Sequence, residues 1–326
     1  MIDDIEAAAR RLVGHATRTP LLNAPLLDDE VGRRIFVKAE CLQKTGSFKY
    51  RGARNAVASL SAEERAAGVI AFSSGNHSQG VALAARELGA PAVIVMPSDA
   101  PELKIENTRK LGAEVVLYDR GSEDRDEIGA SLASQRKLNL IKPFDDVRVI
   151  AGQGTCGLEI AEQASEAGVE AKDVLICCGG GGLTSGIALA LAARAPCLTP
   201  RPVEPEGFDD VARSLAAGAI QINNRRSGSL CDAIITPSPG DITFPILAAH
   251  CGDGIVVTED EALRAMAVAF TRLKIVLEPG GAVALAAALF HREDDSDVIA
   301  VASGGNVDAP VFRMALERYG QGGRRC

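Results

Sequence analysis

The chain has 326 residues, 47% of them apolar and 24% charged, and a formal net charge of −8. This length favours about two domains rather than one. The acidic balance argues against a general nucleic-acid or membrane-surface role, and no apolar run is long enough to span a bilayer. Because the acidic N-terminal residues 1–6 lack the profile of a signal peptide, we expect a cytoplasmic protein.

Eight cysteines are spread through the chain, mostly in apolar or glycine-rich surroundings, and none forms a CxxC pair. Cys177 and Cys178 are adjacent in a strand-like run, where their side chains point to opposite faces. The pattern predicts buried thiols in a reducing compartment and neither a disulfide framework nor a zinc site.

Predicted strands and helices alternate along most of the chain. An amphipathic helix at 2–13 is followed by a strand at 34–38 and a helix at 53–60. Further strands are expected at 68–72, 90–96, 113–118 and 139–142, and helices at 81–88, 101–111 and 123–137. This alternation, with short connections rich in Gly or Pro, is typical of a doubly wound parallel sheet.

The second half repeats the pattern more loosely. Strands are expected at 173–178, 254–257 and 298–302, helices at 152–166, 183–194, 258–273 and 280–290, and a closing helix that ends near 318. Residues 200–240 are rich in Pro, Gly, Asp and Asn, and only 211–217 favours a helix there. We expect two doubly wound α/β domains: a large one formed by residues 1–68 and 146–326, and a small mobile one formed by residues 69–145.

Lys49 lies at the start of the helix that follows the strand at 34–38. Thr45, Gly46 and Ser47 are start signals for that helix, which puts Lys49 in or near its first turn. The N–H groups and the dipole of the helix disfavour a cation there, so the pKa of this lysine should be lowered. A lowered pKa is what a Schiff-base lysine needs. Taken alone, a solvated lysine is still the better explanation.

Four glycines, Gly179–Gly182, stand between a buried strand and the helix at 183–194. Without Cβ atoms this backbone can fold around an oxyanion, at which the helix N-terminus also points. The run matches neither a Walker loop nor the dinucleotide fingerprint. Close helix packing would explain one or two glycines, whereas four favour a site for one phosphate monoester.

Two further turns follow predicted strands, at the edge where doubly wound sheets bind ligands. Residues 73–77 offer hydroxyls, backbone N–H groups, an amide and an imidazole, a set that suits a carboxylate and a phenolate-type oxygen. An ordinary N-cap accounts for one serine but less easily for the whole cluster. Ser303, on a tight turn, offers a hydroxyl that can bond a neutral pyridine nitrogen.

A lysine, a phosphate loop and a hydroxyl for a pyridine nitrogen together indicate pyridoxal phosphate. The motifs at 44–52, 73–79, 179–183, 278–282 and 303–308 resemble, in the same order, those of the serine/threonine dehydratase and serine racemase family. The resemblance covers nearly the whole chain. It implies a fold-type II enzyme of the tryptophan synthase β-like superfamily. We expect a small-molecule amino-acid substrate and a homodimer.

The resemblance also implies roles for individual residues. Lys49 would hold the cofactor and act as general base, and Ser74 resembles the base on the opposite face of the substrate. Further cofactor contacts would come from Phe48, Asn76, Gly179, Gly180, Gly181, Gly182, Leu183, Glu278 and Ser303. Substrate contacts would come from Ser73, Ser74, Gly75 and His77, with Arg125 and Ser238 placed for a second carboxylate. A surface role for Arg125 beside Glu123 or Asp126 is equally well supported.

The resemblance implies a divalent cation at residues 204–210. There Glu204 and Asp210 would supply carboxylates and Phe208 a backbone carbonyl, and oxygen ligands suit Mg²⁺ or Ca²⁺. By spacing alone, a solvated acidic loop explains the segment as well.

Together these features predict β-elimination of a β-hydroxy-α-amino acid to a 2-oxo acid and ammonia. The substrate would be L-serine, L-threonine or 3-hydroxyaspartate. Ser74 keeps a serine or aspartate-type racemase as the alternative. A nucleotide-binding dehydrogenase would need a dinucleotide fingerprint, and a non-catalytic binding protein would have no need of Lys49.

Overall fold

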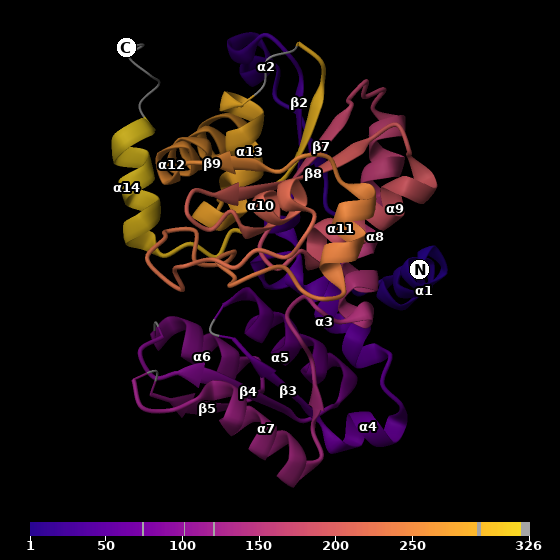
Figure 1. Cartoon of the computed structure of the whole chain (residues 1–326), viewed down its shortest axis with the longest axis vertical. Coiled ribbons are helices and arrows are strands. Elements are labelled where there is room, and N and C mark those ends of the chain that lie inside the picture. Colours follow the sequence, from indigo (N-terminus) through magenta and orange to yellow (C-terminus); the bar gives the residue numbers. More distant parts are fainter. Residues whose placement is uncertain (74, 101, 120, 292–294, 321–326) are drawn as a thin grey trace.

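Two sheets organise the computed structural model, which describes residues 1–73, 75–100, 102–119, 121–291 and 295–320 (Figure 1). Within these residues, the first sheet has the order β1 (Leu21–Leu22), β2 (Ile35–Lys38), β10 (Val298–Val301), β7 (Asp173–Cys177), β8 (Thr199–Pro205) and β9 (Ile255–Val257). The second has the order β5 (Glu114–Tyr118), β4 (Ala92–Pro97), β3 (Val69–Phe72) and β6 (Asn139–Leu140). Neighbouring strands are parallel except β1 and β2, which confirms the predicted parallel α/β class.

The helices cover the faces of the two sheets (Figure 1). Around the second sheet lie α3 (Lys49–Ala58), α4 (Ala62–Ala67), α5 (Asn76–Leu88), α6 (Glu102–Lys110) and α7 (Arg125–Arg136). Around the first lie α1 (Ile2–Leu12), α2 (Pro25–Val31), α8 (Val147–Glu166), α9 (Gly182–Arg194), α10 (Asp210–Ala217), α11 (Thr243–His250), α12 (Glu259–Val268), α13 (Pro279–Phe290) and α14 (Ala309–Tyr319). A π-helical turn, Ala269–Leu273, follows α12.

α3 joins the two halves of the molecule. It packs against α5 on the side of the second sheet and against α8 on the side of the first. Its residues Ala53, Ala56 and Val57 belong to the apolar core around β3 and β4. The division into a large domain and a small mobile domain, residues 69–145, stays a prediction.

Three helices near the junction begin earlier than apolar periodicity predicts. α3 begins at Lys49 rather than at 53, α5 at Asn76 rather than at 81, and α8 at Val147 rather than at 152. Their first turns carry polar or small residues, so that the periodic apolar pattern starts only one turn later. The N-termini of α3 and α5 therefore fall where the ligand-binding motifs were expected.

β8 was not predicted, because Pro200, Pro202 and Pro205 disfavour a central strand. The register explains how the sheet accepts them. β7 pairs with Thr199–Val203, whereas β9 pairs only from Val203 onward. The N–H of Thr199 points toward β7, and successive residues of a strand point their nitrogens to alternate sides. The nitrogens of Pro200 and Pro202 therefore point to the opposite side, where β9 has not yet begun. The nitrogen of Pro205 points to the β7 side, beyond the end of β7.

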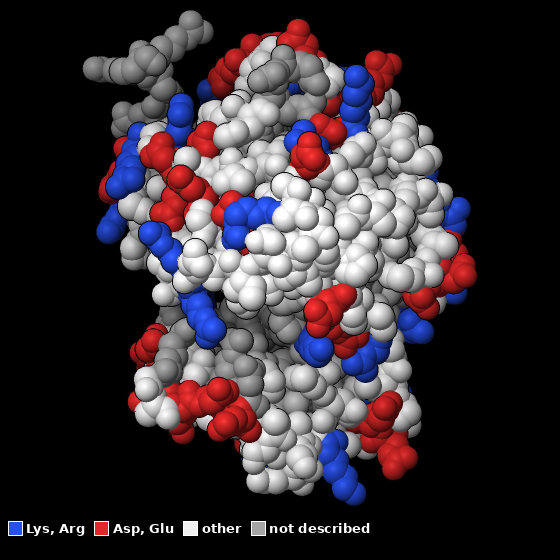
Figure 2. All heavy atoms as spheres, viewed as in Figure 1, with Lys and Arg blue, Asp and Glu red and all other residues white. Residues whose placement is uncertain are grey.

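The surface and the cysteines agree with the composition. On the face in Figure 2, acidic and basic side chains are interspersed and form no extended basic patch. Among the described residues, no helix is long and apolar enough to cross a membrane. Cys41, Cys156, Cys177, Cys178 and Cys231 are buried free thiols, as predicted, whereas Cys197 is exposed.

Candidate active site

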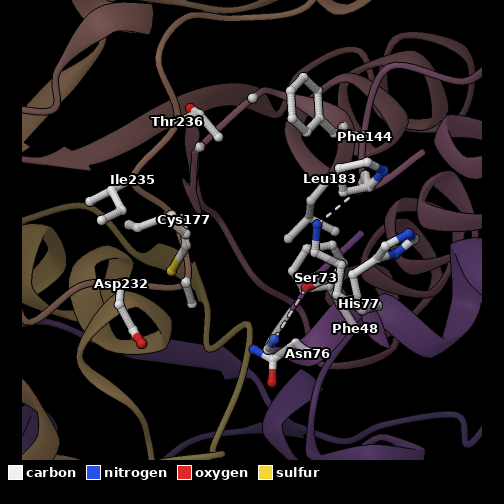
Figure 3. Close-up of a pocket in the computed structure, with 18 of the residues that line it drawn as sticks. Phe48, Ser73, Asn76, His77, Phe144, Cys177, Leu183, Asp232, Ile235 and Thr236 are labelled. Atoms are coloured by element: carbon white, nitrogen blue, oxygen red, sulfur yellow. Dashed lines mark hydrogen bonds between the residues drawn. The ribbon is translucent and has the colours of Figure 1, made fainter. Parts of the chain in front are cut away.

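A cavity of about 360 Å³ lies at the carboxyl ends of β3 and β7, between the two sheets. In Figure 3, Phe48, Ser73, Asn76 and His77 lie on one side of it, and Asp232, Ile235, Thr236 and Cys177 on the other. Of the residues expected at the site, those that line the cavity are Phe48, Lys49, Ser73, Gly75, Asn76, His77, Gly179, Gly180, Gly181, Gly182, Leu183 and Glu278. Expected residues from four separate motifs thus meet in one cavity.

The glycine run at the start of α9 is required by close packing. A Cβ on Gly180 would lie 2.4 Å from the ring of Phe144, and one on Gly182 would lie 2.9 Å from the Cα of Phe144. Gly181 has φ 90°, a conformation that favours glycine. The first N–H groups of α9 have no acceptor within the helix, and their residues line the cavity. This backbone therefore offers an anion site at a helix N-terminus.

Thr243 holds the glycine run in place from α11. Its hydroxyl donates to the carbonyl of Gly180 at 2.7 Å and accepts from the N–H of Gly240 at 2.9 Å. The carboxylate of Asp145 in turn accepts from the N–H groups of Ile242 and Thr243, which begin α11. The anion site is thus fixed by contacts from two distant segments.

Lys49 is the first residue of α3, and its amine points into the cavity. The Nζ atom donates to the carbonyl of Pro143 at 2.8 Å and lies 5.1 Å from the ring centroid of Phe48. Burial lowers the pKa of Lys49 to about 8, although the nearby Glu278 acts to raise it. A useful fraction of this amine is therefore neutral at physiological pH, as nucleophilic or base chemistry requires.

Hydrogen bonds link the side chains of Asn306, Asn76 and Glu278, and the last two line the cavity. Asn306 donates to the side-chain oxygen of Asn76 at 2.7 Å, and Asn76 donates to Glu278 at 2.6 Å. Burial raises the pKa of Glu278 to about 7, against the hydrogen bond from Asn76, which lowers it. The orientation of the Asn76 amide is thus fixed from both ends.

His77 is held in its neutral form. Its Nε2 lies 2.8 Å from the carbonyl of Ile141, which can only accept, so Nε2 carries the proton. Burial and the nearby Lys49 lower the pKa of His77 to about 3. Its Nδ1 is buried and has no hydrogen-bond partner among the described residues. This side chain offers an acceptor rather than a positive charge, so His77 itself supplies no donor for a carboxylate in the cavity.

Four other expected site residues are not among the described residues that line the cavity. Ser74 and the side chain of Arg125 lie outside the described residues. Ser238 is not among the described residues that line the cavity. Ser303 lies just behind the cavity wall, where its carbonyl accepts from the N–H of Phe48 at 3.1 Å and its own N–H donates to the carbonyl of Gly281 at 3.3 Å. The roles expected for these four residues stay predictions.

The expected metal segment forms a buried acidic pair at the start of α10. Glu204 accepts from the N–H groups of Val211 and Ala212, at 2.9 and 2.7 Å. Burial and the neighbouring Asp210 raise the pKa of Glu204, and burial raises the pKa of Asp210 to about 7. One carboxylate oxygen of Asp210 is buried and unpartnered within the described residues.

This acidic pair has the chemistry of a cation site. Burial leaves both carboxyl groups short of a compensating charge, and oxygen ligands suit Mg²⁺ or Ca²⁺. Among the described residues, no group of three or more His, Cys, Asp or Glu side chains is placed to hold a metal ion. The expected set of two carboxylates and the carbonyl of Phe208 would therefore need further ligands from other groups.

Sequence reasoning missed Phe144, Lys104, Asp232 and Thr236, which also line the cavity. Phe144 stood between the strand expected at 139–142 and the helix expected at 152–166, and Asp232 and Thr236 in a segment with no periodic pattern. Their position depends on contacts between segments far apart in the chain, so no local signal marked them.

The comparisons with known proteins agree with this geometry. The family model described as "Pyridoxal-phosphate dependent enzyme" matches residues 12–304. The chain is 42% identical to an L-threo-3-hydroxyaspartate ammonia-lyase from Pseudomonas sp, over 96% of this chain and 98% of the relative. A crystal structure of a T.th. threonine deaminase is 45% identical, with a TM-score of 0.88, and covers 94% of this chain and 98% of its own.

A structure of maize serine racemase has a TM-score of 0.90 at 37% identity and covers 97% of each chain. The residues that the family model matches include Lys49, the glycine run and Glu278. The maize structure shares the fold over almost the whole chain. The chain belongs to the family of pyridoxal-phosphate-dependent enzymes, with the fold of the fold-type II group that includes threonine deaminase and serine racemase.

Proposed function

We propose that this enzyme catalyses the pyridoxal-phosphate-dependent β-elimination of a β-hydroxy-α-amino acid, giving a 2-oxo acid and ammonia. The observation that carries the proposal is the buried amine of Lys49, with its pKa lowered to about 8, in the same cavity as the glycine-lined N-terminus of α9. Relatives named as hydroxyaspartate and threonine ammonia-lyases support the reaction class.

The cavity residues fit the cofactor in three ways. The N–H groups at the start of α9 suit its phosphate, and the buried hydroxyl of Thr236, which has no partner among the described residues, offers a further donor. Asn76, with its amide orientation fixed, suits the phenolic oxygen. The ring of Phe48 stands beside Lys49, where it can pack on the cofactor ring.

When bound, pyridoxal phosphate supplies an electron sink that acidifies the α-carbon of the substrate. Lys49 is the residue that would hold the cofactor, and its amine, once released, is placed to take the α-proton. Having accepted that proton, the same side chain is a donor for the departing β-hydroxyl. The low polarity around Lys49, which lowers its pKa, also limits competing proton exchange with water.

The substrate is tested by steady-state kinetics with L-serine, L-threonine and L-threo-3-hydroxyaspartate, followed by measurement of 2-oxo acid and ammonia. We expect all three to react, with the highest kcat/KM for hydroxyaspartate, in keeping with the name of the Pseudomonas sp relative. The absence of 2-oxo acid from every substrate would refute β-elimination.

Racemisation is the second candidate, because several relatives are named serine racemase. Ser74 would then serve as the base on the second face of the substrate. Incubation with L-serine and chiral chromatography distinguish the two reactions. We expect pyruvate as the main product, and D-serine formed faster than pyruvate would favour the racemase.

We further propose that Glu204 and Asp210 with the carbonyl of Phe208 hold Mg²⁺ or Ca²⁺, on the strength of the unpartnered oxygen of Asp210.

We also propose that the enzyme is a cytoplasmic homodimer and that residues 69–145 move as a unit. Sedimentation of the holoenzyme tests the dimer, and a single species with the mass of one chain would refute it.

A further inference from the structure

An ion pair between Lys104 and Asp232 joins the two sides of the cavity. Lys104 belongs to α6, beside the second sheet, whereas Asp232 lies in the segment between α10 and α11 (Figure 1). Both residues line the cavity that holds Lys49, and Asp232 is on the side opposite Asn76 and His77 (Figure 3). The pair therefore faces any ligand that enters.

The two partners differ strongly in burial, and their contact is loose. The side chain of Lys104 is only 17% exposed, that of Asp232 is 64% exposed, and Nζ and Oδ2 are 3.9 Å apart. Solvent screens an exposed carboxylate at this distance, so the pair contributes little and separates easily. A largely covered ammonium with such a weak partner favours a better-placed anion.

The ammonium of Lys104 lies within electrostatic reach of the reacting groups. Lys104 acts to lower the pKa of Glu278, and Asp232 acts to raise it. Glu278 in turn interacts with Lys49. In the described part of the cavity lining, Lys49 and Lys104 are the only lysines, and no arginine is present. Since Lys49 is committed to the cofactor, Lys104 is the described cation left for a substrate anion.

We propose that Lys104 binds the second carboxylate of a dicarboxylic amino-acid substrate, and that Asp232 pairs with its ammonium until the substrate replaces it. The inference rests on the proposed β-elimination and identifies 3-hydroxyaspartate as the type of substrate the cavity selects. Serine and threonine have no second carboxylate, so they leave the pair between Lys104 and Asp232 in place.

The first test compares kcat/KM for hydroxyaspartate and for L-serine in variants of the holoenzyme. Lys104→Met should lower the value for hydroxyaspartate about 10- to 100-fold, as for loss of a charged hydrogen bond, and that for serine several-fold less than that for hydroxyaspartate. Lys104→Arg should retain most of the wild-type kcat/KM for hydroxyaspartate. Asp232→Asn should raise kcat/KM for hydroxyaspartate, because the competing carboxylate is gone. Lys110→Met, an exposed position on the same helix, is the matched control.

The second test measures binding without turnover. Succinate has its carboxylates two carbons apart, as in hydroxyaspartate, and butyrate has the same chain with one carboxylate. Succinate should raise the melting temperature of the wild-type holoenzyme more than butyrate does, and Lys104→Met should abolish this difference.

The two tests separate failure of this inference from failure of the proposed function. A wild type that produces no 2-oxo acid refutes β-elimination, while the succinate experiment still decides whether Lys104 binds a second carboxylate. Equal losses for serine and hydroxyaspartate in Lys104→Met, or a succinate effect that persists in that variant, would overturn the inference. If Arg125→Ala abolishes the succinate effect and Lys104→Met does not, the role belongs to Arg125.

Discussion

The two walls of the cavity are built in different ways. On the wall from the first sheet, Gly179, Gly180 and Gly182 each lie so close to another segment that a Cβ would overlap it. On the wall from the second sheet, a Cβ on Gly75 would meet nothing within 4 Å. The first wall is tightly packed backbone at three positions, whereas the second has free space for a side chain at Gly75.

This difference contrasts a site built by backbone packing with one that side chains can alter. Threonine deaminase and maize serine racemase superpose on this chain with TM-scores of 0.88 and 0.90, although their names give different reactions. A backbone site for a phosphate tolerates few changes, whereas side chains on an open wall can change with little cost to the fold. In the proposed function, packing fixes the cofactor side, and a few side chains such as Lys104 determine the substrate side.

The largest expected effect is at the junction of the two walls. Lys49→Ala should lower kcat for β-elimination about 10³-fold or more, because it removes the amine that holds the cofactor and moves the α-proton. The measurement is the rate of 2-oxo acid formation, with circular dichroism to show that the variant folds. Retention of a tenth or more of the wild-type kcat in a folded Lys49→Ala protein would contradict the assignment.

A substitution on each wall tests the comparison itself. Gly180→Ala forces its Cβ against the ring of Phe144 and should cost about 1–3 kcal/mol of stability, together with cofactor affinity. Gly75→Ala, its control on the open wall, should cost clearly less. The measurements are thermal unfolding and titration of the apoprotein with pyridoxal phosphate.

The contact with Phe144 can be isolated by a double substitution. Phe144→Ala should recover part of the stability that Gly180→Ala loses, because it removes the ring that the new methyl group meets. Equal losses at Gly75 and Gly180, or no recovery with Phe144→Ala, would remove the distinction between the walls.

The pH dependence of cofactor uptake reports the state of Lys49. Its pKa is lowered to about 8, so the neutral amine needed for uptake is half formed near that pH instead of near the ordinary value of about 10.5. Glu278 acts to raise this pKa, so Glu278→Gln should shift the midpoint to lower pH. Stopped-flow uptake rates measure both midpoints. A shift to higher pH in Glu278→Gln would be inconsistent with this electrostatic coupling.

The smallest expected effect is at the acidic pair, away from both walls. Because the pKa of Asp210 is raised to about 7, the folded state keeps a proton that the unfolded chain loses near its ordinary pKa. The stability from this group is thus full below that ordinary pKa and is lost as pH rises to about 7. A bound cation replaces the proton, so Ca²⁺ should raise the melting temperature by a few degrees near pH 8 and by less near pH 5.

Two variants test whether Asp210 is responsible for the Ca²⁺-dependent rise in melting temperature. Asp210→Asn should abolish the Ca²⁺ response, while Asp209→Asn, at the neighbouring position outside the proposed ligand set, should retain it. Thermal unfolding with EDTA or with Ca²⁺ measures both. A Ca²⁺ response of the same size in Asp210→Asn would exclude this residue as a ligand.

The contrast between the walls also explains which parts of the molecule could be predicted from sequence. Strands and helices of the parallel sheets follow from local periodicity, and the helix expected from 258 begins with a capping box at Thr258. The glycine run was informative because packing excludes other residues at several successive positions.

Other features depend on distant parts of the chain and left no local pattern. β8 contains three prolines and is a strand only because its neighbours β7 and β9 leave their nitrogens unopposed. The pairing of Lys104 with Asp232 joins residues 128 positions apart, and the packing of Phe144 on Gly180 likewise depends on the assembled sheets. The proposed substrate side depends on such contacts, which is why the sequence left the substrate open.

The most direct test of the account is to identify the lysine that holds the cofactor. The holoenzyme is reduced with borohydride, digested, and analysed by mass spectrometry for the peptide that carries the pyridoxyl group. We predict a single modified site at Lys49, and loss of both the modification and the visible absorbance band in Lys49→Ala. Modification of a different lysine, or an unchanged absorbance band in Lys49→Ala, would contradict the central claim.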